Sequence, residues 1–134
     1  MKKLTLIFTL LFSTVMFPSA SFAEWTKVST SVDGDEYYVD FERIRKADGY
    51  VFYWVMYNFI KPSPSGNLSD RTYTQGDCKY FRSKWLSILW HKEPLGQGFG
   101  ESKGPVLKEH QSWKYPPPNS THESILKSVC DYVK

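Results

Sequence analysis

The sequence has few cysteines, few histidines and little net charge. Its 134 residues include two cysteines and three histidines. There is no Cys-x-x-Cys, and His91, His110 and His122 have none of the spacings typical of metal ligands. Each of the three is expected to be a surface histidine. The sequence therefore predicts no metal site and no cofactor.

Sequence signatures of catalysis are also missing. No Gly-x-Ser-x-Gly occurs, so no serine is expected on a nucleophile elbow. The glycines of residues 96–100 resemble a phosphate-binding loop, but no helix pattern follows them, which favours a turn. Asp33, Asp35 and Asp40 do not match the spacing of a calcium-binding loop. We therefore predict no enzyme; a cleft that brings a histidine and a carboxylate together would favour one.

Net charge gives no reason to expect a nucleic acid partner. The chain has 17 basic and 14 acidic residues, a net charge of +3. Lys2 and Lys3 belong to the leader described below, and without them the balance is +1. Binding to phosphates requires clustered Lys and Arg. The basic residues between positions 79 and 92 are explained more simply as solvated strand edges.

Residues 1–23 have the pattern of an export signal. Two lysines precede an apolar run over residues 4–17, and Ser21-Phe22-Ala23 places small residues where signal peptidase cleaves. The run is shorter than the roughly 20 residues of a membrane-spanning helix. We expect cleavage after Ala23. Residues 24–134 then have the length of one domain.

The leader predicts export to the periplasm, the cell surface or the medium. No cysteine follows the apolar run, so the sequence predicts no lipid anchor. Nothing in the residues predicts a membrane-spanning segment after cleavage.

Residues 50–60 form the most apolar stretch of the predicted domain. They are aromatic, β-branched or otherwise uncharged throughout. Both faces of a strand here would be apolar, which predicts a central strand covered on both sides. Alternation places Phe52, Trp54 and Met56 on one face and Val51, Val55 and Phe59 on the other.

Other segments predict the remaining strands of a mostly antiparallel sheet of about five or six strands. A bend anchored by Ile44 and a proline-rich loop over residues 61–67 interrupt them. Gly76 marks a candidate bulge. Alternation in the fifth strand places Trp85 and Leu89 on the face opposite Ile88. The predicted strands other than the central one are residues 24–30, 36–41, 71–82, 85–91 and 110–115.

The last residues change from strand to helix periodicity. Ser120 and Glu123 have the spacing of a capping box. Glu123 and Lys127 lie four residues apart, in the order that favours an ion pair. The apolar stripe of this amphipathic helix is formed by Ile125, Leu126, Val129, Cys130 and Val133.

The two cysteines most simply form a disulfide, because the chain is expected to be exported. Cys78 lies on the fourth predicted strand and Cys130 on the helix, so their bond would tie the helix to the sheet. A redox or metal role is the alternative, and the wide spacing disfavours it. The residues thus predict an α+β fold: one small domain with an antiparallel sheet and one disulfide-tied C-terminal helix.

Aromatic residues are too many to be buried together in a small core. They make up 17% of the chain. Some are expected to form an apolar surface patch that binds a protein or carbohydrate. The alternative is that they stack across strands and stabilise the sheet. The candidate binding surface consists of Tyr38, Tyr53, Tyr57, Tyr73 and Trp85.

Short motifs follow one another in a characteristic order along residues 24–134. They are Trp25, Tyr37-Tyr38-Val39-Asp40, Ile44, Trp54, Asp77-Cys78, the Gly96/Gly98 turn, Trp113, a proline-rich link and Val129-Cys130. In this order the chain resembles the surface-adhesin E family of Gram-negative bacteria. The resemblance implies an antiparallel sheet with a disulfide-fastened C-terminal helix. It also implies adhesion to host cells and matrix proteins.

Two functional hypotheses follow, with an enzyme as a weaker third. The first is a non-enzymatic binding protein, adhesin-like, that uses a sheet face or the 61–69 loop to bind a host matrix or cell-surface protein. The second is a soluble periplasmic protein that binds a small apolar ligand or an envelope partner. A homodimer is compatible with either hypothesis.

Overall fold

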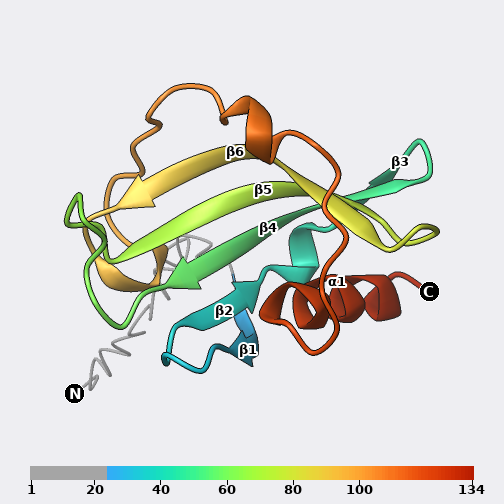
Figure 1. The fold of residues 1–134 in the computed structure, drawn as a ribbon, viewed down its shortest axis with the longest axis horizontal. Coiled ribbons are helices and arrows are strands. Elements are labelled where there is room, and N and C mark those ends of the chain that lie inside the picture. The colour runs from blue at the N-terminus through green and yellow to red at the C-terminus, as the bar shows by residue number, and fades with distance from the viewer. Residues whose placement is uncertain (1–23) are drawn as a thin grey trace, which may run out of the picture.

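The computed structural model describes residues 24–134, which form one antiparallel sheet and one α-helix (Figure 1). The leader predicted for residues 1–23 lies outside the described residues. The helix, α1, spans Thr121–Tyr132. The strands are β1 (Thr26–Thr30), β2 (Glu36–Val39), β3 (Arg45–Ala47), β4 (Tyr50–Asn58), β5 (Ser69–Asp77) and β6 (Arg82–His91). Three short 3-10 turns are η1 (Phe41–Arg43), η2 (Pro94–Gly96) and η3 (Lys108–His110).

β4 is the central strand, as the sequence predicts. The order in the sheet is β1-β2-β4-β5-β6, and β3 pairs with β4 off this path. β5 pairs with β4 along almost its whole length, whereas β2 and β3 share its other edge. This arrangement confirms the predicted α+β fold and the antiparallel sheet.

The sixth strand differs from the one predicted. Residues 110–115 do not form a strand; they start at the last residue of η3 and contain an isolated bridge between Lys114 and Ser83. Instead, β3 forms where a bend was expected. Asp48 and Gly49 both have positive φ angles, 54° and 82°, which suit the tight hairpin that folds β3 back onto β4. The turn, rather than β propensity, decides that this polar segment is a strand.

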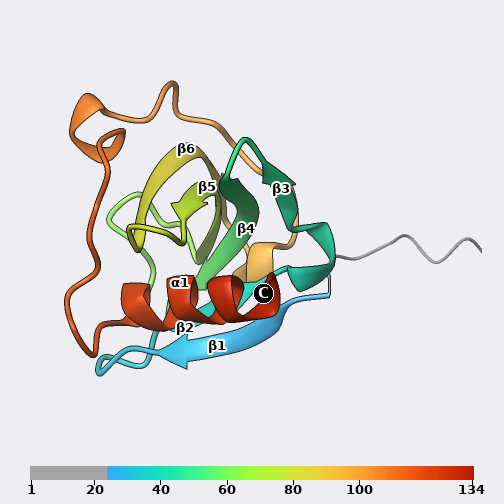
Figure 2. The same ribbon diagram turned by 90° about the vertical axis from the view of Figure 1, so that its right-hand side faces the viewer.

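The helix α1 packs on one face of the sheet, which we call the helix face (Figure 2). Ser120 caps α1 by accepting a hydrogen bond from the Glu123 N–H at 3.1 Å. The Glu123 carboxylate accepts in turn from the Asn119 N–H, and Lys127 pairs with Asp131 rather than with Glu123. The buried core joins sheet and helix through Val39, Val51, Tyr53, Val55, Ile125 and Val129.

Gly76 on β5 allows this packing to be close. A Cβ there would lie 2.9 Å from Val51 Cγ2 and 3.1 Å from Leu126 Cδ1. The bulge predicted at Gly76 occurs elsewhere, in β6, where the register with β5 shifts between Tyr73 and Thr74.

The opposite side of the sheet, the outer face, is covered only in part. Met56 is buried, next to the η2 turn, whose Gly96 lies against it. Phe52 and Trp54 are half-buried. The prediction that β4 is covered on both sides therefore holds on the helix face and only at Met56 on the outer face.

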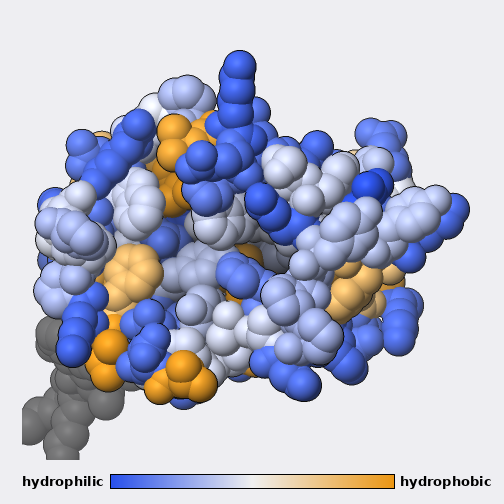
Figure 3. All heavy atoms as spheres, in the orientation of Figure 1, coloured by the Kyte–Doolittle hydropathy of each residue, from blue (hydrophilic) through white to orange (hydrophobic). Residues whose placement is uncertain are grey.

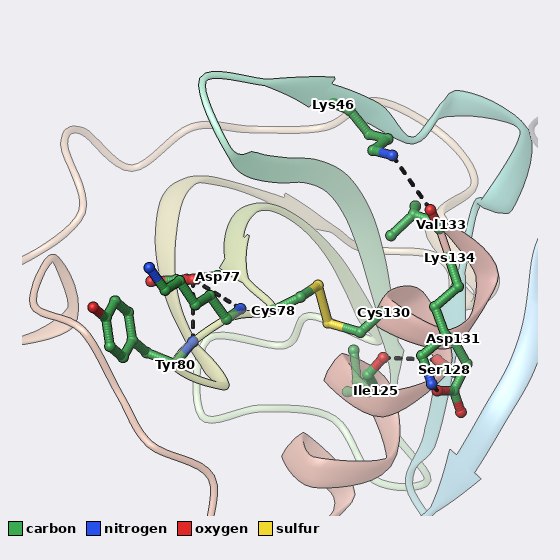
Figure 4. Close-up of a disulfide and its surroundings, with 11 residues drawn as sticks. Lys46, Asp77, Cys78, Tyr80, Ile125, Ser128, Cys130, Asp131, Val133 and Lys134 are labelled. Atoms are coloured by element: carbon green, nitrogen blue, oxygen red, sulfur yellow. Dashed lines mark hydrogen bonds and ion pairs between the residues drawn. A yellow bond between two sulfur atoms is a disulfide. The ribbon is translucent and has the colours of Figure 1, made fainter.

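The predicted disulfide is present between Cys78 and Cys130, whose Cα atoms lie 5.7 Å apart (Figure 4). Cys78 lies in the turn just after β5 rather than within a strand. The Lys46 ammonium of β3 also donates a hydrogen bond to the Val133 carbonyl at 3.3 Å. Two contacts from the sheet thus hold the C-terminal end of α1.

We predict that removing the disulfide weakens the fold strongly. The bond closes a loop with a sequence separation of 52 residues. In the chain-entropy model, a loop of this size contributes about 4 kcal/mol. The double variant Cys78→Ser/Cys130→Ser should lose about this much free energy of unfolding in urea titrations. Wild-type protein treated with reductant is the control and should show the same loss, while equal stability of all three forms would contradict the prediction.

Candidate functional site

The chain between β6 and α1 crosses the helix face and encloses a groove. We call residues 101–119 the strap. The strap is attached to β6 at two bridges, Trp90–Glu101 and Ser83–Lys114. A cavity of about 610 Å³ lies between strap, sheet and the first turn of α1, and a second of about 290 Å³ adjoins it. The space-filling view shows this face hollowed near its centre (Figure 3).

The two cavities share three lining residues, Trp85, His110 and His122, and we treat them as one site, the aromatic groove. The sheet forms its floor, the strap its roof, and His122 of α1 one end. Its wall is mostly apolar, and the strap contributes Val106 and Leu107. A concave apolar site with a few polar groups is the usual form of a ligand-binding site.

The floor of the groove contains one row of residues across four strands. Tyr37 of β2 pairs with Tyr57 of β4, Tyr57 pairs with Asp70 of β5, and Asp70 pairs with Trp90 of β6. The rings of Tyr37 and Tyr57 meet edge to face, with centroids 5.1 Å apart. A single carboxyl group thus lies between the aromatic side chains of its two neighbouring strands.

The bulge in β6 brings Trp85 into the groove. Thr72 pairs with Ile88, whereas Thr74, two residues further along, pairs with Trp85. The extra residue in β6 reverses the alternation, so Trp85 faces the same side as Ile88 and Trp90. Our prediction that Trp85 and Ile88 lie on opposite faces is therefore wrong, because a bulge changes which face each later residue occupies.

Asp70 is the carboxylic acid that lines the groove, and its pKa is shifted. It is 6% exposed, and the Thr72 hydroxyl donates a hydrogen bond to its Oδ1 at 3.0 Å. Burial raises the pKa of Asp70 to about 7, although the Thr72 hydrogen bond acts in the other direction. Burial, and then the charge of Asp70, also raise the pKa of Tyr57 well above its usual value. Near neutral pH, Asp70 is therefore poised between its two protonation states.

Two of the three histidines lie in the groove. The His110 ring stacks on Trp85 with centroids 5.0 Å apart, and His122 lies 6.4 Å from both Tyr57 and Trp85. Partial burial lowers the pKa of His122. The groove therefore brings histidines and a carboxylate together, the arrangement that would favour an enzyme. Within residues 24–134, however, no hydrogen bond or ion pair joins Asp70 to either histidine.

His91 is buried rather than a surface residue, which corrects our prediction. Its side chain lies under η2, on the outer face. Arg71 Nε donates to His91 Nε2 at 3.0 Å, and His91 Nδ1 lies 3.1 Å from the Gln97 carbonyl. Both ring nitrogens are thus engaged, and burial lowers the pKa of His91. The role of this histidine is structural.

The five residues of the candidate binding surface do not form one surface. Tyr57 and Trp85 line the groove. Tyr53 is 1% exposed and belongs to the core, so it cannot contact a partner in the folded protein. Tyr38 and Tyr73 lie opposite Met56 and Trp54, on the outer face. Strand alternation separates them, since odd and even positions of β4 face opposite sides.

The outer face has its own aromatic patch, formed by Phe52, Trp54 and Tyr73. Tyr73 lies between the other two rings, with centroids 4.9 Å from Trp54 and 6.2 Å from Phe52. The guanidinium groups of Arg45 and Arg71 lie over Phe52 and Trp54 at 5.1 and 5.9 Å. We call these five residues the outer patch.

The sequence prediction missed Asp70, Trp90 and the strap as parts of a site. Asp70 stands in a polar stretch of β5, and only its pairing with Tyr57 and Trp90 reveals that it is buried. In the described residues 24–134, no three His, Cys, Asp or Glu side chains gather as metal ligands. No helix of this part of the chain is both long and apolar enough to cross a membrane.

Comparison with known proteins decides the family. The family described as Surface-adhesin protein E matches residues 25–131. The chain belongs to the surface-adhesin protein E family. The match covers nearly all of the described domain, including both cysteines and the strap. No curated protein matches the chain significantly.

Solved structures of Haemophilus influenzae protein E share the fold of this chain. Crystal form II of protein E superposes with a TM-score of 0.63 at 20% sequence identity, covering 82% of this chain and 90% of that one. A second structure of that protein has a TM-score of 0.61 at 19% identity, covering 80% and 83%. Protein E from non-typeable Haemophilus influenzae has a TM-score of 0.57 at 18% sequence identity, covering 85% of this chain and 80% of that one. At this identity the likeness establishes the fold.

We predict that Asp70→Asn stabilises the protein at high pH. The raised pKa means that ionised Asp70 opposes folding: the cost is absent below about pH 4 and complete above about pH 7. Asn keeps an acceptor for Thr72 without the charge. The variant should gain roughly 2 to 4 kcal/mol at pH 8.5 and no more than about 1 kcal/mol at pH 4.5 in urea unfolding.

Asp131→Asn is the matched control for this variant. Asp131 is exposed on α1, and hydrogen bonds from Lys127 and Lys134 lower its pKa. Its replacement should change stability little and in the opposite direction. An Asp70→Asn variant that is less stable than wild type at pH 8.5 would show that Asp70 is ionised without cost.

Proposed function

We propose that this protein is a non-enzymatic, exported binding protein that holds a small apolar ligand in the aromatic groove. The observation that carries the proposal is the groove itself. Its larger cavity has a volume of about 610 Å³ and is lined mainly by aromatic and aliphatic side chains. This volume lies within the usual range for sites that bind small molecules. The predicted leader would bring the protein to the periplasm or the cell surface.

In residues 24–134, no hydrogen bond orients a histidine of the groove as a general base would require. The rings of His110 and His122 lie against aromatic rings, and His110 Nε2 lies 3.6 Å from the Glu109 carboxylate, beyond hydrogen-bond range. The hydroxyl of Tyr57 is held neutral by a raised pKa, which makes it a poor nucleophile. Membership of an adhesin family also supports binding rather than catalysis.

An adhesin-like contact with a protein partner is the second candidate function. The outer patch supports it, because Trp, Tyr and Arg side chains supply much of the binding energy in many protein interfaces. Trp54, Tyr73 and Arg71 are only half-buried here, and Arg45 is exposed. The cation–π contacts hold both arginines over the rings, so little conformational freedom is lost on binding. The partner would be a host matrix or cell-surface protein, an envelope protein or a second copy of this chain.

We predict that Trp85→Ala weakens the binding of a neutral apolar probe to the groove. N-phenyl-1-naphthylamine, which fluoresces in apolar surroundings, should bind wild-type protein at micromolar concentration. Loss of the Trp85 ring removes contacts of about 1.4 kcal/mol, a tenfold loss of affinity. Trp54→Ala, on the outer face, is the matched control and should bind the probe as wild type does. If the wild-type protein does not increase the fluorescence of the probe, the proposal is wrong.

We predict that binding to a protein partner depends on the outer patch and not on Trp85 of the groove. The Trp54→Ala/Tyr73→Ala variant should lose at least tenfold in affinity for immobilised matrix proteins, while Trp85→Ala keeps it. Surface plasmon resonance against a panel of matrix proteins measures both. If wild-type protein binds none of them at micromolar concentration, the adhesin-like candidate is wrong and the groove proposal is unaffected.

A further inference from the structure

We propose that the ligand of the aromatic groove is an organic ammonium ion, whose charged nitrogen sits over Asp70 between Tyr57 and Trp90. This inference rests on the proposed function of the groove and specifies the ligand further, as an apolar body that carries one charged nitrogen. Three observations carry it: a buried carboxyl without a cation, aromatic neighbours on both sides, and a lysine of the strap already placed over one of them.

The carboxyl of Asp70 lacks a partner of opposite charge. It is 6% exposed and lines the cavity. Thr72 supplies the hydrogen bond that the structure gives it, and no Lys, Arg or His in residues 24–134 forms an ion pair with it. A buried carboxylate is costly unless a cation pairs with it. A neutral ligand would leave this cost in place, whereas a cationic ligand would remove it.

Aromatic side chains flank Asp70 on the same face of the sheet. Tyr57 and Trp90 are its cross-strand neighbours, and Tyr37 meets the ring of Tyr57 edge to face. Trp85 lines the same cavity. Rings arranged around a cation attract it through their quadrupoles, most strongly when the cation leaves water. Aromatic walls around a single acid favour a bulky, weakly hydrated ammonium over a metal ion or a small, strongly hydrated cation.

Lys103 of the strap occupies part of this site in the structure. Its ammonium lies 5.4 Å from the centroid of the Trp90 ring. The lysine is largely exposed and forms no ion pair with Asp70, so it can be displaced. The contact shows that the Trp90 side of the groove accepts an alkylammonium group. A ligand ammonium would replace Lys103 and also reach the carboxylate.

Binding of such a ligand is expected to depend on pH. Ionised Asp70 attracts the cation, and its pKa is about 7. The other titratable groups that line the groove are Tyr37, Tyr57, Lys103, His110, Lys114, Tyr115 and His122. The pKa of Tyr57 is raised, so this side chain stays neutral, and the lowered pKa of His122 means that its ring repels the ligand no more as the pH rises. Affinity should therefore rise with pH, and Asp70→Asn separates the carboxyl from the histidines.

The experiment compares two probes of the same shape. Benzyltrimethylammonium carries a charge, and neopentylbenzene is its neutral carbon isostere. Titration of wild-type protein at pH 8.5, followed by tryptophan fluorescence, should show at least tenfold tighter binding of the cation. The preference should shrink severalfold at pH 5.5. In Asp70→Asn it should be absent at both pH values, while the neutral probe still binds.

Two further variants make the test specific. Asp131→Asn removes an exposed carboxylate of α1 and should keep the full preference for the cation. Lys103→Met removes the competing ammonium and should raise the affinity for the cation severalfold. Equal binding of both probes at pH 8.5 would overturn the inference and leave the apolar groove intact. Binding of neither probe would overturn both the inference and the proposed function.

Discussion

The architecture depends on one constraint: a single short helix covers only part of one face of the sheet. The disulfide and the Lys46 hydrogen bond hold α1 over β1 and β2, and its buried side chains share a core with Val51, Tyr53 and Val55 of β4. β6 and most of β5 are left without a helix on that face, since α1 meets β5 only near Gly76. The strap passes over it, fastened to β6 at two bridges. An irregular segment packs less densely than a helix, and the groove is the space that remains beneath it.

The electrostatics of the groove follow from the same arrangement. Asp70 would be an ordinary surface carboxylate if β5 were an edge strand facing water. Between Tyr57 and Trp90 and under the strap it loses most of its hydration, which raises its pKa to about 7. The protein tolerates this because the core beneath α1 and the disulfide supply the stability. Ionisable groups that destabilise the folded state are common at ligand-binding and catalytic sites.

The sequence predicted the fold better than the site. The apolar run of β4, the N-cap at Ser120 and the two cysteines are local signals, and each was confirmed. The groove depends on non-local features. A bulge in β6 moved Trp85 to the helix face, and a hairpin made β3 a strand, so simple alternation misassigned both. The position of Asp70 follows from register with two other strands, which no local pattern reveals.

The most direct test of this account uses the five tryptophans as reporters. Each indole N–H gives one signal in a ¹H–¹⁵N NMR spectrum, and Trp85 and Trp90 line the groove while Trp54 lies on the outer face. Titration with a neutral apolar probe should shift the Trp85 and Trp90 signals and leave that of Trp54 in place. A shift of Trp54 without shifts of Trp85 and Trp90 would contradict the claim that the groove is the binding site.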